Sequence, residues 1–237
     1  MGRAFEVRKV SMAKTAAAKS KIYARYGKEI YMAAKSNPDP ETNQLLKRTI
    51  ERAKREQVTA DVIKRAIDKA KGGVDENYYT KIYEGFGPEG AMIIIDCLTD
   101  NDNRTIAEIR TAFKKTDQKI GISGSVLHQF ENLAVFAIKA SEDEVLELVL
   151  ENDLNITDIE TQDELTTIYA NTNEYATVRD VLTNKDYELI VDEIAYIPLN
   201  TIEITNPENM DTFKKLIDML EVSDDVQNIY HNVKGIE

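Results

Sequence analysis

The sequence is poor in cysteine, histidine and long apolar runs. It has one cysteine, Cys97, two histidines and no tryptophan among 237 residues. A single cysteine excludes a disulfide within the chain, and inside "IIDCLT" it is typical of a small buried strand residue rather than a reactive thiol. The longest apolar stretches, such as 91–96, are far shorter than the roughly 20 residues that cross a bilayer. With no secretory signal pattern near its start, we expect a cytoplasmic protein without a membrane span.

The sequence also lacks the residue clusters that catalytic and metal sites require. His128 and His231 come from distant segments, and neither has a cysteine or second histidine at ligand spacing, which argues against zinc. The stretch "DNDNRT" at 100–105 is like the start of a calcium loop, but it lacks the central glycine and the twelfth residue is threonine. Helix capping by Asp102 or Asn103 explains it better. We expect no cofactor, no metal and no enzymatic activity.

The sequence does contain strong and uneven charge. It carries 30 Lys and Arg against 42 Asp and Glu, a net charge of −12. Residues 1–73 hold 18 basic and 8 acidic residues, whereas 74–237 hold 12 basic and 34 acidic ones. Such an asymmetry is typical of a polyanion-binding part joined to an acidic body. The "KGG" at 71–73 marks a helix end and a linker, so a domain boundary is expected near residue 75.

Three helices are predicted in the basic segment. Apolar residues recur at helical spacing over 14–35, 41–56 and 60–71, with Asp39 as a candidate N-cap of the second helix. On the first helix several cations fall within about 40° of one direction, away from an apolar face. This basic stripe consists of Lys14, Lys21, Arg25, Lys28 and Lys35. The second helix places three arginines opposite its apolar side, and three helices of this length can close a small bundle.

The basic stripe favours nucleic-acid binding over a helix face that is merely solvated. A solvated surface normally mixes both signs, whereas this stripe contains no acidic residue, and tyrosines beside it are able to stack on bases. The alternative, that the cations only solvate the bundle, stays open. The second and third helices form a hairpin like a helix-turn-helix, but any helical hairpin does, so no recognition helix is assigned. The predicted nucleic-acid-binding residues are Lys14, Lys19, Lys21, Arg25, Lys28, Lys35, Arg48, Arg52 and Arg55.

The acidic part alternates strands and helices. Strand-like runs at 78–86 and 91–99 precede a helix, and the segment 121–140 is expected to supply two more strands. From about residue 134 the predicted order is βαββαβ, which is typical of a ferredoxin-like domain. A strand at 200–205, a helix and a last strand at 226–231 then return to the first sheet. The predicted fold is α+β with an N-terminal helical bundle at 1–75, a central α/β sandwich domain at 76–133 completed by 200–237, and an inserted ferredoxin-like βαββαβ domain at 134–199.

Several stretches resemble the YebC/PmpR family over nearly the whole chain. They are "YEGFGPEGA" at 83–91, "LTDNDNRTIAEIRTAF" at 98–113, "GSVLHQFE" at 124–131, and the basic opening that ends in "AIDKAKGG". The resemblance implies three domains with a cleft between them and a non-enzymatic, nucleic-acid-binding role. The family that the chain resembles also has a related mitochondrial member, a translational activator of cytochrome c oxidase. Family members commonly open with Gly-His-Ser-Lys-Trp, whereas this chain has Gly2, Arg3, Ala4, Phe5 and Glu6, which is similar to the YeeN-like branch.

We therefore expect a regulator of gene expression that binds nucleic acid through its N-terminal domain. The target is either promoter DNA, or ribosomal and messenger RNA on the ribosome. Bacterial members of the family that the chain resembles are called probable transcriptional regulators, which favours DNA. The lack of a recognition helix favours RNA, because backbone contacts alone do not specify a base sequence. A second hypothesis is an adaptor that binds a protein partner through its acidic ferredoxin-like module and uses no nucleic acid. We expect a monomer.

Overall fold

The computed structural model describes residues 16–72 and 76–235 as a mixed α+β structure with two antiparallel sheets. Its α-helices are α2 (Ala16–Ala34), α3 (Gln44–Arg55), α4 (Ala60–Lys71), α5 (Asp102–Lys115), α6 (Glu142–Glu151), α7 (Tyr175–Asn184) and α8 (Pro207–Glu221). Its strands are β1 (Tyr79–Phe86), β2 (Met92–Thr99), β3 (Lys119–Ile120), β4 (Phe130–Lys139), β5 (Ile156–Gln162), β6 (Leu165–Asn171), β7 (Val191–Pro198) and β8 (Val226–His231). This confirms the predicted α+β class.

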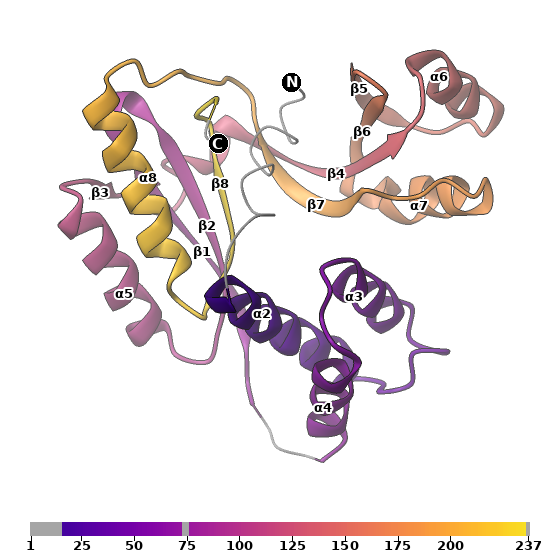
Figure 1. Ribbon diagram of the computed structural model, residues 1–237, viewed down its shortest axis with the longest axis horizontal. Coiled ribbons are helices and arrows are strands. Elements are labelled where there is room, and N and C mark those ends of the chain that lie inside the picture. The colour runs from indigo at the N-terminus through magenta and orange to yellow at the C-terminus, as the bar shows by residue number, and fades with distance from the viewer. Residues whose placement is uncertain (1–15, 73–75, 236–237) are drawn as a thin grey trace.

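Figure 1 shows the elements in three groups. Helices α2, α3 and α4 lie at the bottom of the view, the first sheet with α5 and α8 lies at the left, and the second sheet with α6 and α7 lies at the upper right. Helix α2 passes close to the first sheet and its far end meets α3 and α4. The division of the chain into three domains stays a prediction.

The helical group packs around one apolar cluster, as the helical periodicity predicted. Tyr26 and Ile30 of α2 are buried against Leu46 of α3 and Ile63 of α4. Helix α3 begins later than expected, because its N-cap is Asn43: the Asn43 side chain accepts a hydrogen bond from the Leu46 N–H at 3.0 Å. The prediction of Asp39 as the cap was wrong, since its carboxylate closes a separate turn by accepting from the Glu41 N–H.

The first sheet has the strand order β3-β1-β2-β8, and α5 and α8 cover one of its faces. Alternation along β2 sends Ile93, Ile95 and Cys97 into the core beneath these helices, whereas Ile94 points to the opposite face. Cys97 is fully buried, which confirms it as a strand core residue, and burial raises the pKa of its thiol to about 12. The last strand, β8, closes the edge of this sheet by pairing antiparallel with β2.

The second sheet has the strand order β5-β6-β4-β7, with α6 and α7 packed on one face. From β4 to β7 the elements follow the predicted order βαββαβ, although β4 starts at Phe130, before residue 134. On the opposite face, Val135 and Tyr169 join a cluster with Ile94 and Tyr230 of the first sheet. The two sheets therefore share an apolar contact.

Two predicted strands are absent from the described chain. Between residues 121 and 129 the backbone forms loops and a short 3₁₀ turn, because the buried carboxylate of Glu84 accepts hydrogen bonds from the N–H groups of Gly124, Val126 and Leu127. The stretch 200–205 contributes a single parallel bridge, between Ile202 and Val233. The cap of α5 is Asn101, which accepts from the Arg104 N–H at 3.1 Å, rather than Asp102 or Asn103.

Candidate nucleic-acid interface

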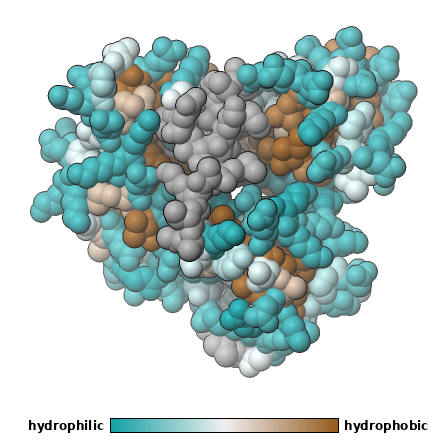
Figure 2. Space-filling view, viewed as in Figure 1, coloured by the Kyte–Doolittle hydropathy of each residue, from teal (hydrophilic) through white to brown (hydrophobic). Residues whose placement is uncertain are grey.

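The helical group α2–α4 carries excess positive charge. Residues 16–72 contain 14 Lys or Arg and 7 Asp or Glu. Four of these cations are exposed and form no ion pair within the part of the chain that the structure describes. They are Lys19, Lys47, Lys54 and Lys64. The face shown in Figure 2 is mostly hydrophilic, with hydrophobic residues gathered in several separate areas.

The predicted basic stripe on α2 does not face solvent along its whole length. Lys14 lies outside the described residues. Lys19, predicted beside the stripe, is exposed, whereas Lys21 is partly buried, and burial lowers the pKa of its ammonium although Glu221 acts in the opposite direction. Lys35 is exposed and donates a hydrogen bond to Asn77 Oδ1 at 3.1 Å.

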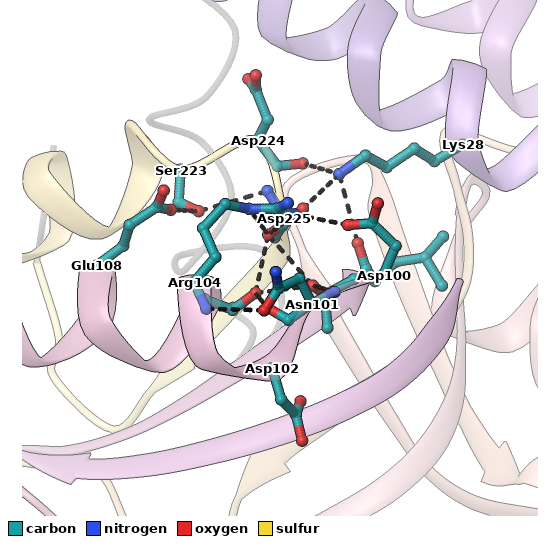
Figure 3. A network of polar contacts seen from close by, with 12 residues as sticks. Lys28, Asp100, Asn101, Asp102, Arg104, Glu108, Ser223, Asp224 and Asp225 are labelled. Carbon is teal, nitrogen blue, oxygen red and sulfur yellow. Dashed lines mark hydrogen bonds and ion pairs between the residues drawn. The ribbon is translucent and has the colours of Figure 1, made fainter. Parts of the chain in front are cut away.

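Lys28 points into a polar network at the junction of α2 with the first sheet (Figure 3). Its Nζ donates to Asp225 Oδ1 at 2.7 Å and to the Asp224 carbonyl at 2.8 Å. The other carboxylate oxygen of Asp225 accepts from Arg104 Nη2 at 2.6 Å and from Thr105 Oγ1 at 2.8 Å. Figure 3 shows Asp225 between the two cations, while Asp102 points away from them. This network connects α2, the start of α5 and the segment before β8.

The electrostatics of Asp225 follow from this position. Burial alone would raise the pKa of the Asp225 carboxyl, but hydrogen bonds from Lys28, Arg104 and Thr105 outweigh burial and lower that pKa to about 2. Its side chain is 3% exposed and that of Lys28 is 15% exposed. A charge pair with so little solvent around it is weakly screened. Asp225 therefore stays ionised at neutral pH and neutralises Lys28.

Arg25 also turns toward the first sheet. Its guanidinium Nη1 donates to the Gln227 carbonyl at 3.4 Å, and its Nε lies 3.7 Å from Glu29 Oε1. The guanidinium carbon lies 4.8 Å from the ring centroid of Tyr26. The expectation that the stripe faces solvent is thus wrong for Arg25 and Lys28, because this side of α2 packs against the residues that begin β8.

The three predicted arginines of α3 all have acidic partners. Arg52 pairs with Glu29 of α2 at 3.2 Å, whereas the other two reach the second sheet and its helix. Arg48 Nη2 lies 3.6 Å from Asp180 Oδ1. Arg55 Nη2 lies 3.0 Å from Asp192 Oδ2.

Asp192 is the centre of this second network. Its carboxylate is fully buried and also accepts from Arg179 Nε at 3.1 Å and from the Tyr175 hydroxyl. Burial would raise the pKa of Asp192, but hydrogen bonds from Tyr175 and Arg55 and the charge of Arg179 outweigh it, so the pKa is lowered. Arg179 continues the network to Glu51 of α3 at 2.5 Å. Cations of α3 therefore attach the helical group to the second sheet.

A cavity of about 830 Å³ lies where α2, α5 and the segment between α8 and β8 meet. Its lining includes the cations Lys28 and Arg104 and the carboxylates of Asp100 and Asp224. Both signs of charge face the same space, so this cavity offers no excess positive charge to a phosphate chain.

Sequence reasoning missed the acidic partners in both networks. Asp225 and Asp192 lie 197 and 137 residues from the cations they neutralise, and periodicity within one helix contains no information about them. The available signal was chemical: "VSDDVQ" at 222–227 places two adjacent carboxylates before a predicted strand. When carboxylates of this kind are buried, they are expected to form ion pairs with cations.

In the described ranges, no group of three His, Cys, Asp or Glu side chains lies close enough together to hold a metal ion. Burial lowers the pKa of His231 to about 4, and its ring packs edge-on against Phe213 at 5.3 Å. No helix in the described part of the chain has the length and apolar character to cross a membrane.

Two family models together match nearly the whole chain. The model described as "TACO1/YebC protein N-terminal domain" matches residues 3–73, and the model described as "TACO1/YebC second and third domain" matches residues 78–233. The chain belongs to the TACO1/YebC family. This confirms the resemblance drawn from the quoted motifs.

Relatives of this TACO1/YebC chain carry regulatory names. A "Probable transcriptional regulatory protein" of Acholeplasma laidlawii is 61% identical over 234 residues, which cover 98% of each chain. A protein of the same name from Pseudoalteromonas atlantica is 50% identical and covers 98% of this chain and 97% of the relative. The crystal structure of a conserved hypothetical protein, Aq1575 from Aquifex aeolicus, has a TM-score of 0.80 at 31% identity, covering 94% of this chain and 93% of that one.

Proposed function

We propose that this chain is a non-enzymatic, cytoplasmic regulator of gene expression that binds the backbone of a nucleic acid through helices α2–α4 as a monomer. The observation that carries this proposal is the set of exposed lysines without ion pairs in the described chain, on helices whose net charge is positive while the rest of the protein is acidic. Unpaired cations attract phosphates and release the counterions around them. The relatives' names as transcriptional regulators support a regulatory role.

The predicted binding residues divide into two classes. Arg25, Lys28, Arg48, Arg52 and Arg55 already pair with carboxylates of this chain. For these five we propose a role in holding the helical group in place, because each would have to leave a carboxylate unpaired before it bound a phosphate. The proposed phosphate contacts are Lys14, Lys19 and Lys21 of the predicted set, joined by Lys47, Lys54 and Lys64, whereas Lys35 already has partners within this chain, Asn77 among them.

We also propose the three-domain division at 1–75, 76–133 with 200–237, and 134–199. It is supported by separate apolar clusters within α2–α4, beneath α5 and α8, and beneath α6 and α7. In this arrangement the acidic domains repel a polyanion and restrict its approach to the side of the molecule formed by α2–α4.

The test is a salt titration of nucleic-acid affinity by fluorescence anisotropy. The probes are a duplex DNA, a single-stranded DNA and a single-stranded RNA of the same sequence. The variant Lys47→Gln/Lys54→Gln/Lys64→Gln should bind at least tenfold more weakly at low salt. Each lost phosphate contact should reduce the slope of log affinity against log salt by about 0.9 for duplex or 0.7 for single strands.

The matched control removes three exposed lysines from the acidic part, as Lys114→Gln/Lys115→Gln/Lys215→Gln. It changes net charge equally, so its affinity and slope should remain close to those of the unchanged protein. Equal losses in both variants would show that net charge alone matters, and the assignment to α2–α4 would be rejected. Absence of binding to all three probes would reject the proposed function itself.

A further inference from the structure

A second cavity, of about 380 Å³, opens between α2 and α4. Its floor is built from small residues, which include Ala24 and Gly27 of α2 and Ala66 of α4. A Cβ atom added at Gly27 would meet no other atom within 4 Å, so open space lies directly above this point of the helix. The volume falls within the range of sites that hold small ligands. The two helices thus leave a slot, which we call the α2–α4 slot.

The α2–α4 slot has aromatic walls held in place by hydrogen bonds. Tyr23 lies in its lining and donates through its hydroxyl to the Gln57 carbonyl at 3.4 Å. Tyr31 and Tyr78 also line it, with ring centroids 6.0 Å apart at an interplanar angle of 82°. The Tyr31 hydroxyl accepts a hydrogen bond from the Glu76 N–H at 3.0 Å. Tyr31 is only 2% exposed and supports the wall, so Tyr23 and Tyr78, which are partly exposed, are the rings on which a base is able to stack.

Cations surround the opening of the slot. Lys28 Nζ lies 5.4 Å from the Tyr78 ring centroid and Lys69 Nζ lies 5.7 Å from that of Tyr31. Arg65 also lines the slot and forms an ion pair with Asp61 at 2.9 Å. The Arg65 side chain is 72% exposed and that of Asp61 is 76% exposed. An exposed pair within one helix contributes little to stability. Arg65 is therefore able to exchange its carboxylate for a phosphate at small cost.

One acidic group completes the lining. Glu76 accepts from Lys69 Nζ at 2.6 Å, and hydrogen bonds from Lys69 and Tyr78 lower the pKa of its carboxyl. The carboxylate is thus ionised at neutral pH and accepts hydrogen bonds. Amino groups on the edges of adenine, guanine and cytosine are donors of the matching kind.

From these features we infer that the α2–α4 slot binds one unpaired base of a single-stranded nucleic acid, with a flanking phosphate on Arg65, while Lys69 stays paired with Glu76. This inference rests on the proposed function and names the form of nucleic acid that the helical group selects. A base inside a duplex is stacked and paired, so it cannot enter a slot between two helices. The slot therefore favours single strands, whereas the exposed lysines attract any phosphate chain. RNA and DNA single strands share this chemistry.

The sharpest test fills the slot without changing charge. Gly27→Leu adds an apolar side chain into the open space, and it also replaces glycine by a better helix former within α2. We expect Gly27→Leu to bind single-stranded RNA and DNA of 12 nucleotides at least tenfold more weakly, with a salt slope near that of the unchanged protein. Binding to a duplex of the same length should change less than twofold.

The matched control is Ala60→Leu, which introduces the same leucine side chain at an exposed position of α4 outside the slot lining. It should leave binding to single strands unchanged. A second measurement uses the unaltered protein and a single strand carrying one 2-aminopurine. Stacking of that base on a tyrosine should change its fluorescence on binding, and the change should be absent when the same base is held in a duplex.

The outcomes separate this inference from the function on which it rests. If Gly27→Leu binds single strands as well as the unchanged protein does, the slot is not the binding site for a base and the inference is overturned. The same conclusion follows if 2-aminopurine shows no change although the strand binds. The proposed function then still stands, provided that the triple lysine variant loses affinity. Comparing the RNA and DNA arms shows which strand the slot prefers.

Discussion

Lys28 Nζ lies 2.7 Å from Asp225 Oδ1, and the two residues are 197 positions apart in the sequence. A cation of the basic helices is thus neutralised by a carboxylate that immediately precedes the last strand. A second pair of this kind, Arg55 with Asp192, joins α3 to the second sheet. The uneven charge of the sequence therefore serves two purposes. Part of it holds the basic helices against the two sheets, and in the proposed function the rest binds nucleic acid.

Removal of the Asp225 charge is expected to destabilise the fold strongly. Asp225→Asn leaves Lys28 without its buried counter-ion, whereas Arg104 keeps Asp100 at 2.8 Å, and the loss of one partner of a buried pair costs about 3 to 5 kcal/mol. Urea unfolding at pH 7 measures this difference in the free energy of unfolding. Asp224→Asn is the control, because the side chain of Asp224 is exposed and Lys28 uses its backbone carbonyl. Equal stability of both variants would contradict the role assigned to Asp225.

Protonation of Asp96 should increase the free energy of unfolding as the pH falls from 6 to about 4. Burial raises the pKa of this carboxyl to about 6, and one of its oxygens is buried without a hydrogen-bond partner in the described chain. The folded state therefore binds the proton more tightly than the unfolded state does, so the charged carboxylate destabilises the fold above pH 6 and ceases to do so by pH 4.

Replacement of Asp96 by asparagine mimics the protonated form. Asp96→Asn should be more stable than the unchanged protein by about 2 to 3 kcal/mol at pH 8, with the difference falling toward zero at pH 4. Thermal unfolding across this pH range measures the effect. An advantage that is constant with pH would mean that Asp96 does not titrate in this range.

Arg55 and Asp192 should be energetically coupled. A double-mutant cycle with Arg55→Met and Asp192→Asn should give an interaction energy of about 1 to 3 kcal/mol in urea unfolding, because the Asp192 carboxylate is fully buried. The exposed pair of Arg65 with Asp61 provides the comparison, with an expected coupling below about 0.5 kcal/mol. If Arg55→Met instead leaves stability unchanged and reduces the salt slope of nucleic-acid binding, Arg55 belongs with the phosphate contacts.

Much of the fold could be predicted from local sequence patterns. Helical spacing located α2, α3 and α4 to within a few residues, and the position of Cys97 inside "IIDCLT" predicted it as a buried strand residue. The βαββαβ order from β4 to β7 followed from the succession of such patterns. These features are local, because each depends on residues within one or two elements.

Contacts between distant segments could not be predicted in this way. The helical wheel grouped Arg25 and Lys28 correctly on one side of α2, but it could not show that this side meets Gln227 and Asp225. Similarly, a strand pattern near residue 124 did not reveal that Glu84 would hold the backbone there as a loop. The α2–α4 slot was also missed, since it depends on which small residues of two helices face each other.

The position of β8 at the edge of the first sheet also has a consequence for synthesis. Its partner β2 is translated about 130 residues earlier, and Asp225 directly precedes β8. During translation, the strands from β4 to β7 emerge whole from the ribosome and are able to pair while the first sheet still lacks an edge. The nascent chain therefore cannot pair Lys28 with Asp225 until the segment before β8 has been made, and Lys28 lacks this counter-ion while residues 29–224 are translated.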